Sequence, residues 1–119
     1  MLKENTLTKS DLKQLHSEYN QTYFDGKLSM PDFRFIARKR PLGRFTKGKI
    51  PVIGISAYRK DWSEGELKNT MIHEMIHQYV YERMWGCRYS IIQHGLQFHF
   101  VRWQLKRRYG LHISGGPMF

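Results

Sequence analysis

The chain has little of what builds disulfide scaffolds or membrane spans. Its 119 residues include one cysteine, Cys87, so neither an intrachain disulfide nor a four-cysteine zinc site can form. No apolar run approaches the ~18–20 residues that cross a bilayer, and the first residues carry no apolar segment typical of a secretory signal. We therefore expect a single domain, residues 1–119, in the cytoplasm, with the nucleoid as a further location.

Acidic residues are absent from two long stretches of the chain. Twenty Lys and Arg stand against ten Asp and Glu, which gives a net charge of +10. Residues 33–60 hold nine basic residues and no acid, and the chain after Glu82 holds six more and no acid. Two stretches of positive charge without acidic residues predict a positive face that binds nucleic acid or another polyanion. DNA is the expected partner, single-stranded DNA included. The predicted contacts are Arg38, Lys39, Arg40, Arg44, Lys47 and Lys49. No membrane partner is expected.

Capping and turn residues predict an α+β fold that begins with a helix. Thr8 stands three residues before Asp11, as in a capping box, and apolar residues then recur at helical spacing as far as Asp25-Gly26. Residues 33–58 alternate as strands do, so they predict a small antiparallel-type sheet. Pro51 lies in the last apolar run, which favours an edge strand there, and an extended substrate could pair with residues 50–56.

A second helix is predicted at about residues 64–85, and its apolar residues surround nearly the whole circumference. Ser63 and Glu66 supply a capping box at its start. Only a narrow polar sector is left, near Lys68, Gln78 and Glu82. Because a helix that is apolar all round is usually buried, this is the predicted central helix. A C-terminal helix is predicted at about residues 94–109.

The buried helix contains the pattern H-E-x-x-H, in His73-Glu74-Met75-Ile76-His77. Histidines at i and i+4 share one helix face with Cβ atoms ~5–6 Å apart, so both rings can bind one Zn²⁺. Glu74 is rotated by about 100° and is placed to act as a general base on the attacking water. Three polar side chains buried on an apolar helix would each cost ~1–3 kcal/mol if unpaired, and a metal accounts for all three.

A catalytic zinc usually has a third protein ligand. The last acidic side chain, Glu82, lies on the same helix about 140° round from His77, which excludes a downstream carboxylate. We prefer His94, which begins the predicted C-terminal helix and precedes Gly95. The alternatives are His99, His112 and Cys87.

The H-E-x-x-H segment followed by His94-Gly95-x-x-Phe98 resembles the SprT-like (Spartan) metalloprotease family. The stretch Tyr23-Phe24-x-Gly26-Lys27-Leu28 is similar to the end of that family's leading helix. The resemblance implies a minimal zincin-like peptidase domain, with zinc ligands His73, His77 and His94 and with Glu74 as the base. Eukaryotic relatives degrade proteins crosslinked to DNA and are activated by DNA. With Cys87 alone, the chain has no cysteine-rich zinc ribbon like that of many members.

Two other functions compete with a DNA-linked peptidase. The first is a nucleic-acid-binding module with a structural or vestigial zinc site, although such a site has no need of Glu74. The second is a zinc hydrolase with a specific protein substrate and no role on nucleic acid. Trp62 and Trp85 are the candidate exposed rings that would stack on bases. Candidates for a second oxyanion donor are Tyr89, His99 and Arg102.

Overall fold

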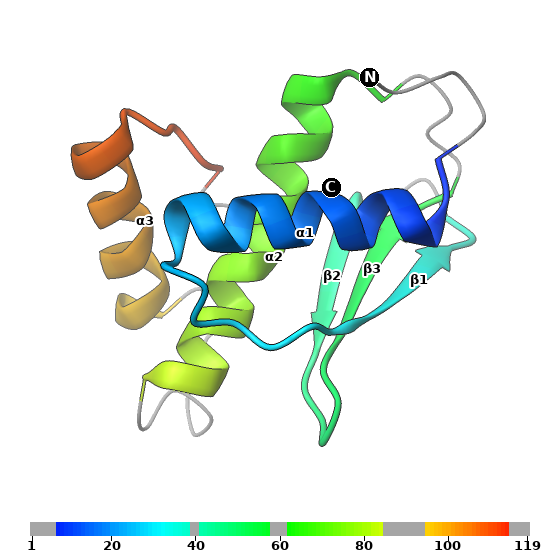
Figure 1. The fold of residues 1–119 in the computed structure, drawn as a ribbon, viewed down its shortest axis with the longest axis horizontal. Coiled ribbons are helices and arrows are strands. Elements are labelled where there is room, and N and C mark those ends of the chain that lie inside the picture. Colours follow the sequence, from blue (N-terminus) through cyan, green and yellow to red (C-terminus); the bar gives the residue numbers. More distant parts are fainter. Residues whose placement is uncertain (1–6, 39–40, 58–61, 85–94, 115–119) are drawn as a thin grey trace.

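The computed structural model describes residues 7–38, 41–57, 62–84 and 95–114. The elements follow the order α1 (Lys9–Tyr23), β1 (Asp32–Ile36), β2 (Gly43–Thr46), β3 (Val52–Ser56), α2 (Glu64–Arg83) and α3 (Leu96–Tyr109) (Figure 1). The predicted α+β class and the three helices are confirmed. Among the described helices, none has the length and apolar character that a membrane crossing requires.

Helix α1 begins and ends at the residues that the sequence predicts. The Asp11 N–H donates to Thr8 Oγ1 at 3.2 Å and the Thr8 N–H donates to the Asp11 carboxylate at 2.9 Å, which completes the capping box. At the other end, Asp25 and Gly26 adopt φ values of 54° and 70°, which turn the chain out of the helix. The Asn20 side chain bridges this turn through both backbone groups of Leu28. The turn therefore directs the chain into β1.

The sheet is mixed, with the strand order β1-β3-β2. Strand β1 runs parallel to β3, pairing Phe33 with Ile53, and β2 runs antiparallel to β3, pairing Phe45 with Ile53. The antiparallel prediction thus holds for one of the two pairs. The prediction that residues 50–56 form an edge is wrong, because β3 is paired on both sides. Pro51 is accommodated because it precedes the strand, and its carbonyl accepts from the Asp32 N–H at 2.9 Å.

Helix α2 is the central helix, as predicted. It packs against α1, α3 and the β2–β3 part of the sheet (Figure 1). Five of its apolar side chains are at most 1% exposed: Leu67, Met71, Ile72, Met75 and Ile76. Ser63 caps its start by accepting from the Glu66 N–H at 3.1 Å. These contacts hold the middle of α2, and with it the H-E-x-x-H segment, at the centre of the domain.

Gln78 belongs to the narrow polar sector predicted for this helix, yet it is not exposed. The side chain is fully buried under α1. Its Nε2 donates to the Ser29 carbonyl at 2.8 Å and to the Glu82 carboxylate at 3.1 Å, so its Oε1 accepts from His16 Nε2 at 2.8 Å. Helical periodicity could not reveal this burial, because α1 reaches this face only in the tertiary fold.

Candidate metal centre

His73 and His77 lie next to each other on α2, with ring centroids 5.2 Å apart. Phe98 of α3 covers both rings, at centroid distances of 4.9 Å from His73 and 4.5 Å from His77. Phe98 is itself buried, since Val101 and Leu105 on the same face of α3 join the core. The two histidines, predicted from the sequence to share one helix face, are therefore covered by Phe98, which limits access of water from the side of α3.

The orientation of the His73 ring is fixed by a backbone carbonyl. His73 Nδ1 lies 2.7 Å from the Ser114 carbonyl oxygen. A carbonyl can only accept, so Nδ1 carries the proton and Nε2 of the neutral ring keeps its lone pair. Ser114 is held in turn, because its N–H donates to Asn69 Oδ1 at 3.0 Å, one helical turn before His73. Metal-ligating histidines show this arrangement, in which the second ring nitrogen donates to a carbonyl.

The Glu74 side chain points toward strand β2, where it lies close to Gly43. The Glu74 side chain is 3% exposed, and this burial raises its pKa to about 8, while the nearby Arg44 charge opposes the rise. The carboxyl fits because Gly43 has no side chain. A Cβ added there would lie 3.0 Å from Glu74 Oε2 and 2.7 Å from Thr70 Cγ2. A carboxyl whose pKa is raised to this range is suited to proton transfer near neutral pH.

The third predicted ligand, His94, lies outside the described residues, as does Cys87. The alternatives His99 and His112 are described. Within the described ranges, no group of three His, Cys, Asp or Glu side chains is placed to hold a metal. Neither His99 nor His112 therefore completes a three-ligand site with His73 and His77 in this structure.

The donor set present fits a zinc ion on chemical grounds. Neutral imidazole nitrogens are common zinc ligands, and His73 presents the tautomer that leaves Nε2 available. The two rings share one helix face at i and i+4, the spacing that lets both bind one ion. Two of the three predicted ligands are thus in a suitable arrangement, and Glu74 stands apart from them as a separate proton-transfer group.

Several residues that shape this site were not predicted. Phe98 was noted only as part of a motif, whereas it covers both histidines. Gly43 was not predicted as part of the site, whereas it begins β2 and makes room for Glu74. No sequence pattern indicated Asn69 and Ser114, because the hydrogen bond from His73 to the Ser114 carbonyl depends on the path of the chain after α3. An available signal was the glycine itself, since a glycine in a strand often marks a close approach.

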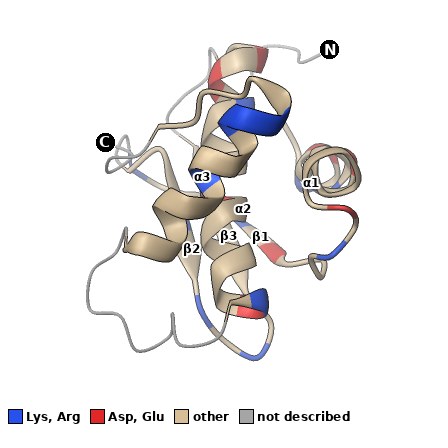
Figure 2. Ribbon diagram, turned by 90° about the vertical axis from the view of Figure 1, so that its left-hand side faces the viewer, with Lys and Arg blue, Asp and Glu red and all other residues tan. Residues whose placement is uncertain are grey.

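The predicted DNA contacts that the structure describes lie in and around the sheet. Arg38, Arg44, Lys47 and Lys49 are all exposed, whereas Lys39 and Arg40 lie outside the described residues. Arg38 follows β1, Arg44 lies within β2, and the two lysines occupy the β2–β3 turn, where Figure 2 shows basic residues at the tip. The described members thus run from the segment after β1, through β2, to the β2–β3 turn.

The other predicted side chains have structural partners or lie outside the described residues. Trp62 is half-buried and its Nε1–H donates to the Ser56 carbonyl at 3.4 Å. Arg102 Nη1 donates to the Ile113 carbonyl at 3.3 Å, and His99 packs edge-on against Phe98. Trp85 and Tyr89 are outside the described residues.

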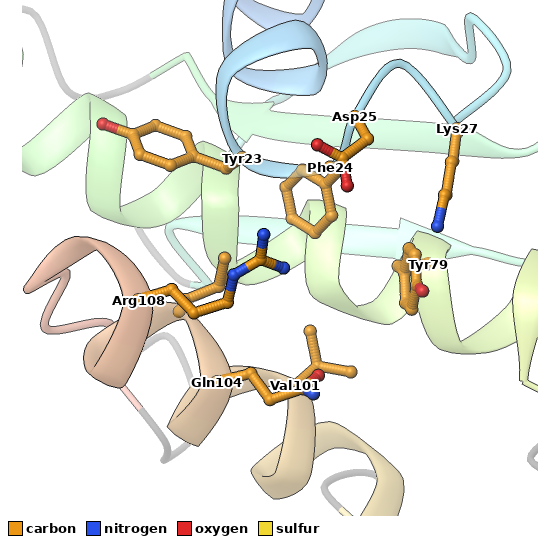
Figure 3. A pocket seen from close by; sticks show the side chains of 9 residues that line it. Tyr23, Phe24, Asp25, Lys27, Tyr79, Val101, Gln104 and Arg108 are labelled. Carbon is orange, nitrogen blue, oxygen red and sulfur yellow. The ribbon is translucent and has the colours of Figure 1, made fainter.

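A separate hollow of about 230 Å³ lies between the end of α1 and α3 (Figure 3). Phe24, Val101 and Leu105 form its apolar part, and polar groups of Asp25 and Arg108 stand at its walls. Neither His73 nor Glu74 lines this hollow. It is therefore not the access route to the histidine pair.

Comparison with protein families identifies the chain. A model of the SprT-like family matches residues 12–114, a span that includes α1, the sheet, the H-E-x-x-H helix and α3. Comparison with curated proteins finds no match. The matched span includes His73, Glu74 and His77 and the residues that orient them, so the family assignment and the local geometry concern the same site. The chain belongs to the SprT-like family, whose domains are of the zinc metallopeptidase type.

Proposed function

We propose that this domain is a zinc-dependent peptidase that hydrolyses peptide bonds in DNA-associated or DNA-crosslinked proteins. The observation that carries the proposal is the division of α2 into two chemical faces. His73 and His77 form a pair of oriented imidazoles on one face, and Glu74 presents a buried carboxyl with a raised pKa on another. A purely structural zinc site would have no use for that carboxyl.

His73, His77 and His94 would hold the zinc ion, which when bound supplies Lewis-acid activation of water and of the substrate carbonyl. Glu74 accepts the proton of the attacking water and returns it to the leaving nitrogen. Phe98 keeps bulk water from the histidine rings. The Ser114 carbonyl accepts from His73 Nδ1–H, so the proton stays on Nδ1 and Nε2 stays available to bind the zinc ion.

Strand β2 is the edge of the sheet that borders Glu74. An extended substrate that paired with β2 would pass beside this carboxyl, which is the geometry that strand addition provides. Arg44 on β2 and the lysines of the β2–β3 turn would lie along the same edge. Substrates bound to DNA would then meet both the strand edge and its positive charge.

The test is cleavage of a histone by zinc-loaded protein, with and without single-stranded DNA. Cleavage that requires both Glu74 and DNA supports the full proposal, and E74Q is the control. Cleavage that is indifferent to DNA keeps the peptidase and discards the link to DNA. Zinc binding and tight DNA binding without any cleavage would favour the second candidate, a nucleic-acid-binding module with a vestigial site. The basic composition is the observation that supports that candidate.

A further inference from the structure

Helix α3 exposes a row of large side chains on its outer face. Leu96, Phe100 and Trp103 are 86%, 50% and 51% exposed. With Arg107 they follow the spacing i, i+4, i+7 and i+11, so they form one continuous stripe, here called the α3 stripe. The opposite face of the helix is buried in the core. The stripe is thus not needed to hold α3 on the domain, and three large apolar side chains in one exposed row call for an explanation.

The rings of the α3 stripe are stacked on one another. Phe100 and Trp103 have ring centroids 6.2 Å apart and an interplanar angle of 28°. The Arg107 guanidinium lies 5.3 Å from the centroid of the Trp103 ring, within the range of a cation–π contact. These contacts order the three side chains before any ligand arrives. A pre-ordered platform loses less side-chain entropy on binding than separate flexible side chains do.

Positive charge surrounds this platform. Helix α3 carries Arg102, Lys106, Arg107 and Arg108 and no acidic residue. Figure 2 shows basic residues over its last turns, with no acidic residue on the helix. Next to Trp103 lies a hollow of about 170 Å³ lined by Arg102, Trp103, Lys106, Leu111, His112 and Ile113. The hydrogen bond from Arg102 to the Ile113 carbonyl fixes one guanidinium at its wall. Cations that line a hollow beside a flat ring favour a ligand with an anionic group next to an aromatic one.

We propose that the α3 stripe binds single-stranded nucleic acid, with bases stacked on Phe100 and Trp103 and a phosphate in the adjoining hollow. Every unpaired base offers a π face to the rings, and every nucleotide offers a phosphate to the cations. A protein partner with an apolar surface would satisfy the rings but would bury Arg107 without a counter-charge. The site is separate from the β2 edge, and its binding can be measured whether or not the chain cleaves peptides.

The test is a titration of the folded protein with an oligo(dT) strand that carries a fluorescent label, because the anisotropy of the label gives the affinity of every variant, including those without Trp103. The fluorescence of Trp103 is followed separately, in a chain that keeps this residue. Trp62 and Trp85 are replaced by phenylalanine, which leaves Trp103 as the single tryptophan. We expect quenching of Trp103, binding that weakens as salt increases, and weaker binding of a duplex whose bases are already stacked. W103A should weaken binding roughly 5- to 100-fold, and W103F should restore most of it. K106A should reduce the slope of log K against log salt by about 0.7.

Matched controls are M30A, which removes another half-exposed apolar side chain, and K13A, which removes a charge on α1. Neither should change affinity more than twofold. Circular dichroism confirms that each variant is folded. The proposal fails if the strand does not bind, or if W103A and F100A bind as tightly as the parent chain, which would assign the strand to the β2 edge. It also fails if W103A abolishes self-association and leaves strand binding unchanged, because the stripe would then join two copies of the chain.

Discussion

At the residue scale, the orientation of His73 depends on two hydrogen bonds. Asn69 accepts from the Ser114 N–H, and the Ser114 carbonyl accepts from His73 Nδ1–H. Groups that orient a metal-ligating histidine usually affect metal affinity or activity 10–100-fold. Because Asn69 acts through Ser114, we expect N69A to weaken zinc binding by roughly tenfold, near the lower end of that range. Zinc affinity would be measured by competition with a chromogenic chelator. T22A, which changes an exposed position of α1, is the control, and an unchanged affinity in N69A would show that the carbonyl contact is not needed.

Gly43 gives a second prediction at this scale. G43A would place a methyl group 2.7 Å from Thr70 Cγ2 and 3.0 Å from Glu74 Oε2, so β2 or the Glu74 carboxyl must move. Overpacking of this kind typically destabilises by about 1–3 kcal/mol, and the displaced carboxyl should lower peptidase activity as well. Thermal unfolding and a peptide-cleavage assay measure the two effects.

Gly65 provides the matched control for that experiment. It lies in the first turn of α2, and a Cβ added there meets nothing within 4 Å. G65A should therefore be neutral or stabilising by up to about 1 kcal/mol, because alanine is the better helix former. If G43A were as stable and as active as G65A, the close approach of β2 to Glu74 would be unimportant.

How far the sequence predicts the site also differs residue by residue. The spacing of His73, Glu74 and His77 is local to one helix, so periodicity alone placed them on one buried element. Gly43 and Ser114 reach the site from strand β2 and from the segment after α3. Their contributions depend on tertiary contacts between distant parts of the chain, which no local pattern encodes.

At the scale of elements, the buried His16–Gln78 pair joins α1 to α2 one residue beyond His77. Burial lowers the pKa of His16 below 6.5, while the Gln78 hydrogen bond and the Glu82 charge oppose this shift. The ring is also packed against Phe33, and its Nδ1 is buried without a hydrogen-bond partner among the described residues. A proton added at Nδ1 would create a buried donor with no acceptor there, so the folded state favours the neutral ring.

Acid should therefore destabilise the folded chain through His16. As pH falls through about 6.5, the unfolded chain takes up a proton at His16 more readily than the folded chain, so the free energy of unfolding decreases. We expect the difference in the free energy of unfolding between the parent chain and H16N, measured with urea, to shrink as pH falls from roughly 7.5 to 5.5. Glu74 contributes with the opposite sign, since its pKa is raised, but that contribution cancels in a comparison with H16N.

H16N should therefore have a lower stability at pH 7.5 and a flatter pH dependence than the parent chain. H112A, which removes an exposed histidine, should follow the parent profile. Parallel profiles of H16N and the parent chain would rule out His16 as the source of the acid sensitivity.

The elements themselves were predicted unevenly. The capping residues Thr8 and Ser63 correctly placed the starts of α1 and α2, because caps are local signals. The order of the strands was not predictable, because the parallel pairing of β1 with β3 brings together residues 20 positions apart, such as Phe33 and Ile53. Pro51 suggested an edge strand. It lies one residue before the start of β3, however, so that strand can be central.

At the scale of the whole molecule, two surfaces among the described residues carry the basic side chains that bear on function. One follows the β2 edge beside Glu74 and the other surrounds the α3 stripe. The sequence predicted the first from its run of basic residues. It also gave six basic residues after Glu82, but the exposure of Phe100 and Trp103 beside them required the structure.

The central claim is that α2 separates metal binding from proton transfer, and E74Q tests it most directly. Zinc content and cleavage of a denatured protein substrate would be measured for the parent chain, E74Q and H77A. We predict that E74Q binds zinc as the parent chain does and unfolds at the same temperature or higher, because a glutamine at this buried position cannot ionise. We also predict that E74Q loses cleavage by at least about 100-fold. H77A should lose zinc and cleavage together. Zinc-loaded E74Q with the activity of the parent chain would contradict the account.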